Sequence, residues 1–196
     1  SARGHRPDGA NSAFTRRSRD CRLPGSAARN TCKPAQFNQL TTRIKGLLLV
    51  AKHFIRPLAL CIFHYHGKIL VNQFHDADKN RMLFRPIGGG IEFGERSHDA
   101  IVREVQEELG RSISDIRLIG TLESIFTYAG KPGHEIVQVY DARFDDAEVY
   151  EQPWLDGHES DGAPFRAAWH SSASFTPASP LVPEGLYDLL KRAMLL

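Results

Sequence analysis

The sequence has little cysteine and no long apolar run. Its three cysteines, Cys21, Cys32 and Cys61, are an odd number, and no two have the C-x-x-C spacing of zinc or redox sites. This excludes a fully paired disulfide framework and agrees with a reducing compartment, so we expect a cytoplasmic protein. Apolar runs such as LLLV at 47–50 fall far short of the ~20 residues that cross a bilayer. We therefore expect no membrane span, and the sequence also lacks an internal repeat.

The chain also lacks a strong overall charge, because a basic beginning offsets an acidic remainder. Residues 1–33 carry eight Lys and Arg against two Asp, a charge of +6, which leaves −4 of the net +2 for the rest. The pI of about 8.5 therefore describes the beginning of the chain, and we do not expect nucleic acid as a partner. Residues 1–45 have few large apolar residues, the composition of a disordered tail or of a transit peptide. We predict a basic, irregular extension over 1–45 and a folded domain over 46–196.

Strand-like and helix-like patterns are mixed within residues 46–196. The segments rich in β-branched and aromatic residues are predicted strands, and they are 58–63, 68–74, 116–128, 135–144 and 167–170. Between the first two, Tyr-His-Gly at 65–67 supplies the glycine of a tight turn. Several strands with one interior and one terminal helix predict an α/β domain with a mixed sheet covered by helices.

Two helices are predicted from capping residues and apolar spacing. The first has Ser97 as its N-cap and ends at Gly110. Its apolar stripe would run from Ile101 or Val102 through Val105 to Leu109. The second would begin at Pro183, which suits a first helical turn. Its apolar positions recur at helical spacing, and they are Leu186, Leu189, Leu190, Ala193 and Met194.

Three carboxylates gather on one turn of the first predicted helix. Glu104, Glu107 and Glu108 stand at i, i+3 and i+4, so they share one face, which we expect opposite the apolar stripe. Like charges at this spacing repel unless a cation offsets them, and Mg²⁺ prefers such oxygen ligands. Arg103 can pair with one carboxylate and orient the others. Taken alone, the helix favours the alternative of a solvated charged face.

A glycine run just before this helix favours a functional role for the three carboxylates over a solvated charged face. Gly88, Gly89 and Gly90 permit positive φ angles and let backbone groups approach a ligand closely. A carbonyl of this loop could join a metal site, and its N–H groups could face a phosphate. Five residues separate Gly89 from Glu95, and seven more precede Arg103. The joint spacing favours a metal–phosphate site over a turn and an exposed helix.

This spacing resembles the box of the Nudix hydrolase family, G-x5-E-x7-R-E-U-x-E-E-x-G-U with U apolar. The match runs from Gly89 to Gly110 with every fixed letter present, and it departs only at the last position, which is Arg111. Ile113, two residues on, is expected to take over that packing. The resemblance implies an α/β/α sandwich with a mixed sheet between helices, and residues 1–45 have no counterpart in it.

The resemblance also implies an activity and roles for the residues of the box. Nudix hydrolases use Mg²⁺ or Mn²⁺ to hydrolyse a nucleoside diphosphate linked to another group, such as a nucleotide, a dinucleoside polyphosphate or a nucleotide sugar. Glu107, Glu108 and the Gly89 carbonyl would be metal ligands, and Glu104 a ligand or the base. Arg103 and Glu95 would stabilise the loop and helix through charge pairing, with Gly88 and Gly90 as structural positions in the box.

One acid outside the box is a further candidate for catalysis. In Nudix relatives an acid shortly before a late strand with Trp often completes the metal site, and Glu159, ahead of Trp169, resembles it. The alternative is a solvated loop acid. His134 and Glu135 begin a strand beside a Gly/Pro-rich loop and are weaker candidates for the cleft.

The substrate is less well determined by the sequence. Tyr128 lies seventeen residues past Arg111, where relatives acting on diadenosine polyphosphates have tyrosine, and Phe126 stands where proline suggests ADP-ribose. Phe126, Tyr128 and Tyr140 could form a platform on which a base stacks, although a strand tyrosine more often serves packing. The aromatic array that marks NADH-cleaving relatives is absent from the sequence.

Other functions stay open at this point. The domain could be a catalytically silent nucleotide-binding or regulatory module, although every box acid is present. It could also hydrolyse RNA ends and use the basic extension to hold the phosphate backbone. Nudix domains often dimerise, so a homodimer is compatible with the resemblance.

Overall fold

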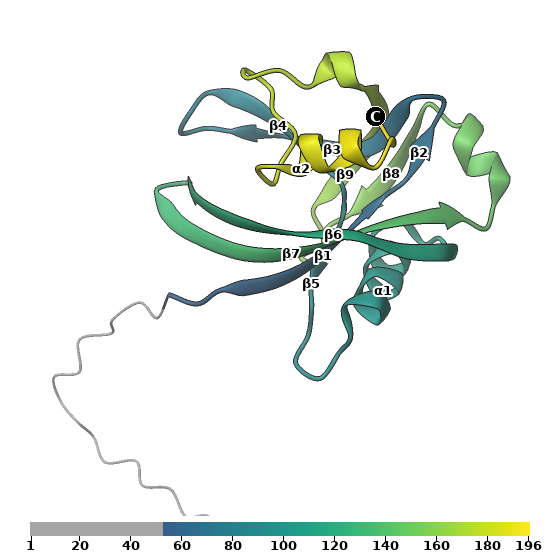
Figure 1. The fold of residues 1–196 in the computed structure, drawn as a ribbon, viewed down its shortest axis with the longest axis horizontal. Helices are drawn as coiled ribbons and strands as arrows, with labels where there is room; N and C mark the ends of the chain where they lie inside the picture. The colour runs from purple at the N-terminus through teal and green to yellow at the C-terminus, as the bar shows by residue number, and fades with distance from the viewer. Residues whose placement is uncertain (1–52) are drawn as a thin grey trace, which may run out of the picture. The chain divides into compact units, whose positions relative to one another are not determined.

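The computed structural model describes residues 53–196 (Figure 1). The predictions made for residues 1–45, and for the boundary behind them, lie outside this part of the chain. No helix within residues 53–196 is long and apolar enough to cross a membrane. The fold subdivides into two sheets and two α-helices.

A mixed four-stranded sheet forms the centre of the domain, with strand order β5-β1-β7-β6. Its bounds are Arg56–Ile62 for β1, Ile87–Gly90 for β5, Ile113–Tyr128 for β6 and Lys131–Phe144 for β7. β1 pairs with β7 in parallel, whereas β5 and β6 pair antiparallel with their neighbours. The predicted mixed sheet is therefore confirmed.

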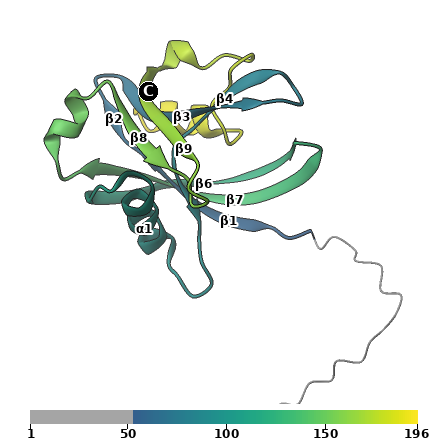
Figure 2. The same cartoon turned by 180° about the vertical axis from the view of Figure 1, so that it is seen from behind.

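A second sheet is entirely antiparallel and was not predicted as a separate unit. It comprises β2 (His64–Tyr65), β3 (Lys68–Asp76), β4 (Arg81–Arg85), β8 (Trp154–His158) and β9 (Pro164–Ser171). The order is β2-β3-β9-β8, with β4 on β3. Figure 2 shows β9 and β8 beside β3 above the mixed sheet. The predicted turn at 65–67 connects β2 to β3, and both His66 and Gly67 have positive φ there.

The helices lie on opposite faces of the mixed sheet, α1 (Ser97–Leu109) on one and α2 (Leu186–Arg192) on the other (Figure 1). Two short 3₁₀ helices, η1 (Ala147–Glu151) and η2 (Ser172–Ser174), occupy the connections. The predicted start of the second helix at Pro183 was wrong, because α2 begins only after Gly185, which has a φ of 83°. Its predicted end was also too late, since Met194 lies beyond the helix and is 89% exposed.

Strand β1 is buried on both faces and separates two apolar clusters. Ala59 and Cys61, together with Phe63 just beyond the strand, belong to the cluster that contains the buried side of α1. Leu58, Leu60 and Ile62 belong to the cluster with Leu186 and Leu190 of α2. Because side chains of a strand point alternately to the two faces, one strand anchors both helices. This continuous burial explains the unbroken apolar run in its sequence.

Candidate active site

The end of β5 and the helix α1 position the acidic residues of the box. Gly110 closes α1 in the left-handed conformation, with a φ of 64°, as the sequence predicts. The predicted N-cap was wrong. Arg96 holds the capping position without a side-chain hydrogen bond, and the Ser97 hydroxyl lies 2.6 Å from the Tyr140 hydroxyl instead. This contact ties the start of α1 to β7.

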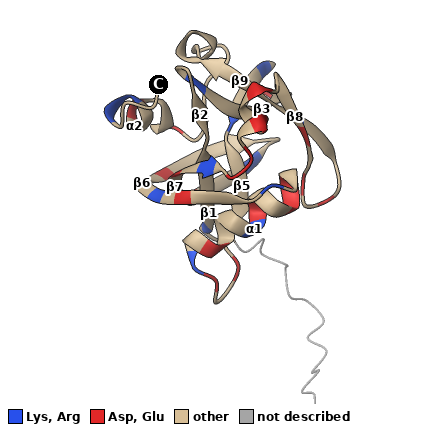
Figure 3. Ribbon diagram, turned by 90° about the vertical axis from the view of Figure 1, so that its right-hand side faces the viewer, with Lys and Arg blue, Asp and Glu red and all other residues tan. Residues whose placement is uncertain are grey.

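Two of the three helical glutamates face inward, which the sequence reasoning did not predict. Glu104 and Glu108 are only 7% and 8% exposed, on the same side as the buried Ile101 and Val105. Val102, one of the two residues proposed to open the apolar stripe, is 39% exposed. The carboxylates are therefore beside the apolar stripe rather than opposite it. Glu107 points elsewhere and its side chain is 54% exposed. Figure 3 shows these acidic positions in red on α1.

The glycines of β5 make room for these two carboxylates. A Cβ at Gly89 would stand 2.6 Å from the carboxyl atoms of Glu104, closer than real Cβ atoms approach. Gly88 has a φ of 127°, and its N–H donates to Glu108 Oε2 at 3.2 Å. Gly90 has open space instead, and its carbonyl accepts from Arg103. The absence of a side chain at Gly89 thus leaves space for the Glu104 carboxylate beside the backbone of β5.

Arg103 connects the loop to the helix. Its guanidinium donates twice to the Glu95 carboxylate, both at 2.9 Å, and once to the Gly90 carbonyl at 2.9 Å. The remaining nitrogen donates to Glu104 and Glu107, both at 3.0 Å. Hydrogen bonds from Arg103 lower the pKa of Glu95 to about 2, and the same bonds raise the pKa of Arg103 above its ordinary value. The structure thus brings Arg103 and Glu95 together as the box residues predict.

The inward-facing carboxylates are held in an environment that disfavours their charge. Burial raises the pKa of Glu108 to about 7, and the charge of nearby Glu159 adds to the rise, while the Gly88 N–H opposes it. Burial also raises the pKa of Glu104, against the charge and hydrogen bond of Arg103. A cation would offset this desolvation cost, because opposite charge favours the ionised form.

Glu159, from the second sheet, joins Glu104 and Glu108 in a group that we call the acidic edge. It lies in the turn between β8 and β9, and its Oε1 accepts a hydrogen bond from Asn72 Nδ2 of β3 at 3.2 Å. Its charge acts on Glu108, so the turn brings it towards the box as the sequence suggests. Among residues 53–196, no three His, Cys, Asp or Glu side chains already converge closely enough to hold a metal.

The chemistry of these donors nevertheless suits a Mg²⁺-type ion. Such ions need only one or two carboxylates, keep several waters and share the oxygens of a phosphate substrate. Two desolvated glutamates one helical turn apart, next to a backbone without a side chain, meet that requirement. Glu107, held by Arg103 and half exposed, is placed less directly than Glu104 and Glu108.

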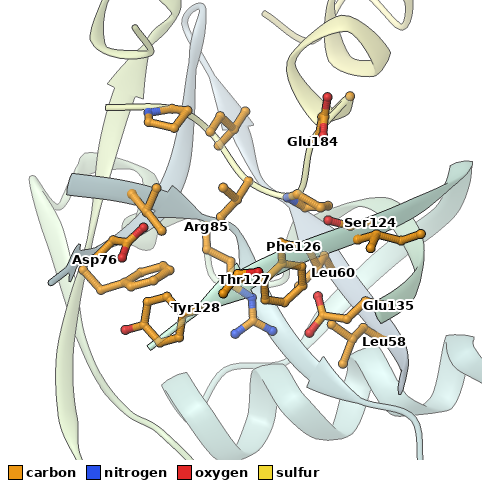
Figure 4. A pocket seen from close by; sticks show the side chains of 18 of the residues that line it. Leu58, Leu60, Asp76, Arg85, Ser124, Phe126, Thr127, Tyr128, Glu135 and Glu184 are labelled. Carbon is orange, nitrogen blue, oxygen red and sulfur yellow. The ribbon is translucent and has the colours of Figure 1, made fainter. Parts of the chain in front are cut away.

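A cavity of about 650 Å³ lies next to this edge, on the α2 side of the mixed sheet (Figure 4). Three of its lining residues, Phe126, Tyr128 and Glu135, are the ones predicted for substrate binding. Arg85 also lines the cavity, and its guanidinium donates to the Gly88 carbonyl at 2.9 Å. The cavity and the box therefore meet at Arg85.

Other candidates from the sequence lie elsewhere. Tyr140 cannot join a base platform, because it is 6% exposed and its hydroxyl is engaged by Ser97. His134 is not among the cavity residues, and its Nε2 lies 2.8 Å from Glu123. Ile113 packs against the α1 cluster, the role expected for it, while Arg111 donates to Asp146 at 3.1 Å.

Sequence reasoning missed three polar residues at the site. Asn72 and Asp76 of β3 are more than ten residues before the box in sequence, and sheet pairing places their strand beside β4, which carries Arg85. Asn72 contacts Glu159, while Asp76 and Arg85 line the cavity. Asn72 and Arg85 are direct partners in the β3–β4 register. Arg85 stands only three residues before Gly88, and this proximity was the one available signal.

Comparison with known proteins shows the family to which the chain belongs. The NUDIX domain family model matches residues 55–192, and the chain belongs to this family. The fold agrees with that class. A MutT protein structure from Bacillus halodurans has a TM-score of 0.50 and 18% identity, over 71% of this chain and 82% of that one. A MutT NUDIX hydrolase structure from Burkholderia pseudomallei has a TM-score of 0.47 and 20% identity, over 70% and 97%.

Two relatives in sequence are NAD-capped RNA hydrolases. NAD-capped RNA hydrolase NudC from Mycobacterium tuberculosis is 27% identical over 121 residues, and the match covers 61% of this chain and 38% of that protein. NudC from Mycobacterium bovis shows the same identity and coverage. The chain thus matches well under half the length of these relatives.

Proposed function

We propose that this chain is a pyrophosphohydrolase that uses Mg²⁺ or Mn²⁺ to cleave a small nucleoside diphosphate derivative. The observation that carries the proposal is the pair of buried carboxylates at the glycine run, Glu104 against Gly89 and Glu108 on the Gly88 N–H. Arg85 connects this run to the cavity. Buried carboxylates without a compensating cation are costly, so their placement supports a metal-binding role.

Glu104, Glu108 and the Gly89 carbonyl would hold the ion, and Glu107 is a further proposed ligand. A bound divalent ion would neutralise charge on phosphoryl oxygens and lower the pKa of the attacking water. Arg103 fixes the carboxylates relative to the loop, because five hydrogen bonds leave its guanidinium little freedom. Its role is to position the other groups.

We assign proton acceptance to Glu159. Glu104 is engaged by Arg103 and packed on Gly89, so it has little freedom to receive a proton. Glu159 lies in a turn, and Asn72 donates to its Oε1, which orients the carboxylate and leaves Oε2 for the water. Arg85, between the cavity and the box, would bind the substrate phosphate.

A phosphate-release screen over nucleoside diphosphate derivatives, with Mg²⁺ or Mn²⁺, tests the proposal. Glu107→Gln and Glu108→Gln should each lower kcat, by about 10²-fold or more for Glu108. Glu123→Gln is a matched control, because Glu123 is 61% exposed and contacts His134 outside the site. Activity that survives both box substitutions would refute the metal site. Tight nucleotide binding without turnover would favour the catalytically silent module.

A second candidate is hydrolysis at an RNA end, and the NudC relatives favour it. The +6 charge of residues 1–33 would then help to hold the RNA backbone. Deleting residues 1–45 should lower turnover on NAD-capped RNA while leaving turnover on free NAD unchanged. Equal turnover on capped RNA with and without these residues would remove this candidate. Light scattering on the same samples would test the proposed homodimer.

A further inference from the structure

A buried carboxylate at the end of β3 faces the cavity without a complete set of partners. Asp76 is 1% exposed and lines the cavity. Among residues 53–196 no group donates a hydrogen bond to its Oδ1. Because buried polar atoms are nearly always paired, an unpaired oxygen in a cavity wall points to a ligand that pairs it.

The neighbouring arginine does not supply this partner. Arg81 lies opposite Asp76 in the β3–β4 pairing, and its Nε stands 3.6 Å from Oδ2, the other carboxylate oxygen. This distance makes an ion pair but is too long for a hydrogen bond. Arg81 therefore balances the charge of Asp76 and leaves Oδ1 available.

Aromatic rings stand on the same side of the cavity. Phe74 and Tyr128 meet edge to face with their ring centroids 6.1 Å apart, and Phe126 lies beside them (Figure 4). Phe126 packs on Gly133, where a Cβ would stand 2.5 Å from the ring. Tyr128 is 40% exposed, so its surface is accessible. Such rings stack nucleobases of any identity, which leaves the choice of base to polar groups.

Arg85 gives the cavity a positive charge where it meets the box, and a phosphate suits that charge. Its guanidinium donates to the Gly88 carbonyl, and its charge partly offsets the rise that burial causes in the pKa of Glu104 and Glu108. A nucleotide with its phosphates at Arg85 and the box would extend its base towards Phe126, Tyr128 and Asp76. The same cavity can therefore hold a phosphate at Arg85 and a base against the rings.

We propose that Asp76 selects the base of the substrate by accepting a hydrogen bond from an exocyclic amino group at Oδ1. A carboxylate only accepts hydrogen bonds, so it favours guanine, adenine and cytosine, which carry exocyclic amino donors, over hypoxanthine and uracil, which carry none. Hypoxanthine has a C–H where guanine has its amine and a carbonyl where adenine has one, and uracil has a carbonyl where cytosine has its amine. This rests on the proposed function to the extent that the ligand is a nucleotide. Asp76 would thereby restrict the substrates to nucleotides whose bases carry an amino group.

Equilibrium binding of nucleoside monophosphates tests this without hydrolysis. Wild-type protein should bind GMP or AMP about tenfold or more tightly than IMP, and CMP more tightly than UMP, because the missing amine leaves Oδ1 unpaired. This comparison needs no variant. Equal affinities within both the purine and the pyrimidine sets, or no binding of any of these nucleotides, would overturn the assignment.

A pair of variants separates selection from stability. Asp76→Asn keeps one acceptor oxygen but loses the charge that strengthens the hydrogen bond, so the preference for amino-bearing bases should fall about threefold or more. Asp141→Asn is the matched control, because Asp141 also has a buried oxygen without a hydrogen bond among the described residues and pairs with Arg117 at 3.0 Å, outside the cavity. It should keep the wild-type preference. Thermal melting verifies that both variants fold.

The outcomes distinguish this inference from the proposed function. Selective binding of amino-bearing bases without hydrolysis would support Asp76 and refute the pyrophosphohydrolase. Hydrolysis with equal rates for GDP and IDP derivatives, and with Asp76→Asn unchanged in its preference, would support the enzyme and refute the role of Asp76. A general loss of affinity in Asp76→Asn at constant base preference would also refute it, because a purely structural residue gives that result.

Discussion

At the scale of single residues, Gly89 shows how the absence of a side chain can define a site. Its backbone faces Glu104 so closely that even a methyl group would collide with the carboxylate. The carboxylate cannot withdraw easily, because Arg103 donates to its Oε1 at 3.0 Å. The motif therefore requires glycine here for space, while at Gly88 it requires glycine for the positive φ as well.

Gly89→Ala should consequently displace Glu104 and abolish most activity. We expect kcat/KM to fall by about 10²-fold, since small displacements of a catalytic group have effects of this size. Gly90→Ala is the control, because a Cβ there meets nothing within 4 Å. Steady-state kinetics on both variants checks the prediction, and similar losses in the two would contradict the role of space at Gly89.

In the metal-free protein, ionisation of the buried Glu108 carboxylate should lower stability, although a metal ligand must be ionised. Its folded pKa of about 7 exceeds the ordinary value of 4.5, so the folded state binds a proton more tightly than the unfolded state. The free energy of unfolding should therefore fall as pH rises from about 4.5 to about 7. In EDTA, Glu108→Gln should remove this loss and be more stable than wild type at pH 8 by about 1–3 kcal/mol.

Urea unfolding at pH 5 and pH 8 measures this difference. The amide oxygen of Gln can still accept from the Gly88 N–H, so the two proteins should be similar at pH 5. Glu107→Gln, at a side chain that is 54% exposed, should bring no gain at pH 8. A wild-type stability that does not decline between the two pH values would contradict the burial argument.

At the scale of elements, one ion pair holds the loop after β5 against α1. Glu95 receives both bonds from Arg103 and one from the Glu92 N–H at 3.0 Å. The pKa of Glu95 is lowered to about 2, so its contribution to stability is present above about 4.5 and is lost as pH falls through about 2. The loop and the helix therefore act as one unit at neutral pH.

Glu95→Gln should loosen this unit. We expect its Tm to lie roughly 2–4 °C below wild type at pH 7, with the difference shrinking towards pH 2. Glu92→Gln is a suitable control, because Glu92 is exposed and its backbone, not its side chain, contacts Glu95. Scanning calorimetry at several pH values would show a constant difference if the ion pair had no part in stability.

Elements with their own periodic pattern were predictable, whereas those defined by their partners were not. The long strands β6 and β7 and the helix α1 have recognisable sequences, but β5 is Ile-Gly-Gly-Gly and is a strand only because it pairs with β1. The inward turn of Glu104 was equally unpredictable, because a helical wheel cannot tell a buried acid from an exposed one. The box spacing identified the chemistry, while Asp76 and Arg85 required the folded sheets.

At the scale of the whole molecule, two hairpins close one end of the cavity. Asp78 in the β3–β4 turn accepts from the Gly130 N–H in the β6–β7 turn at 2.6 Å, and Lys79 donates to the Thr127 carbonyl at 3.5 Å. These contacts join the tips of hairpins from different sheets. The cavity wall thus depends on the relative position of the two sheets.

Asp78→Ala should loosen this closure without touching the acidic edge. We expect KM for the substrate to rise roughly three- to tenfold at unchanged kcat, since one hydrogen bond of about 1 kcal/mol is lost. Asp146→Ala removes the bonds from Arg111 and from the Glu148 N–H, both outside the cavity, and should leave KM unchanged. A fall in kcat with constant KM would place Asp78 in the chemistry instead.

The position of β1 also determines the order in which the site can be assembled during synthesis. Its antiparallel partner β5 follows shortly, so the glycine run and α1 can dock soon after they leave the ribosome. Its parallel partner β7 pairs Leu58 with Val137, 79 positions later, and such distant pairing is slow. The acids of the box can therefore dock on β1 before Phe126 and Tyr128 of β6 are fixed in the cavity wall, because β6 joins the sheet only through β7.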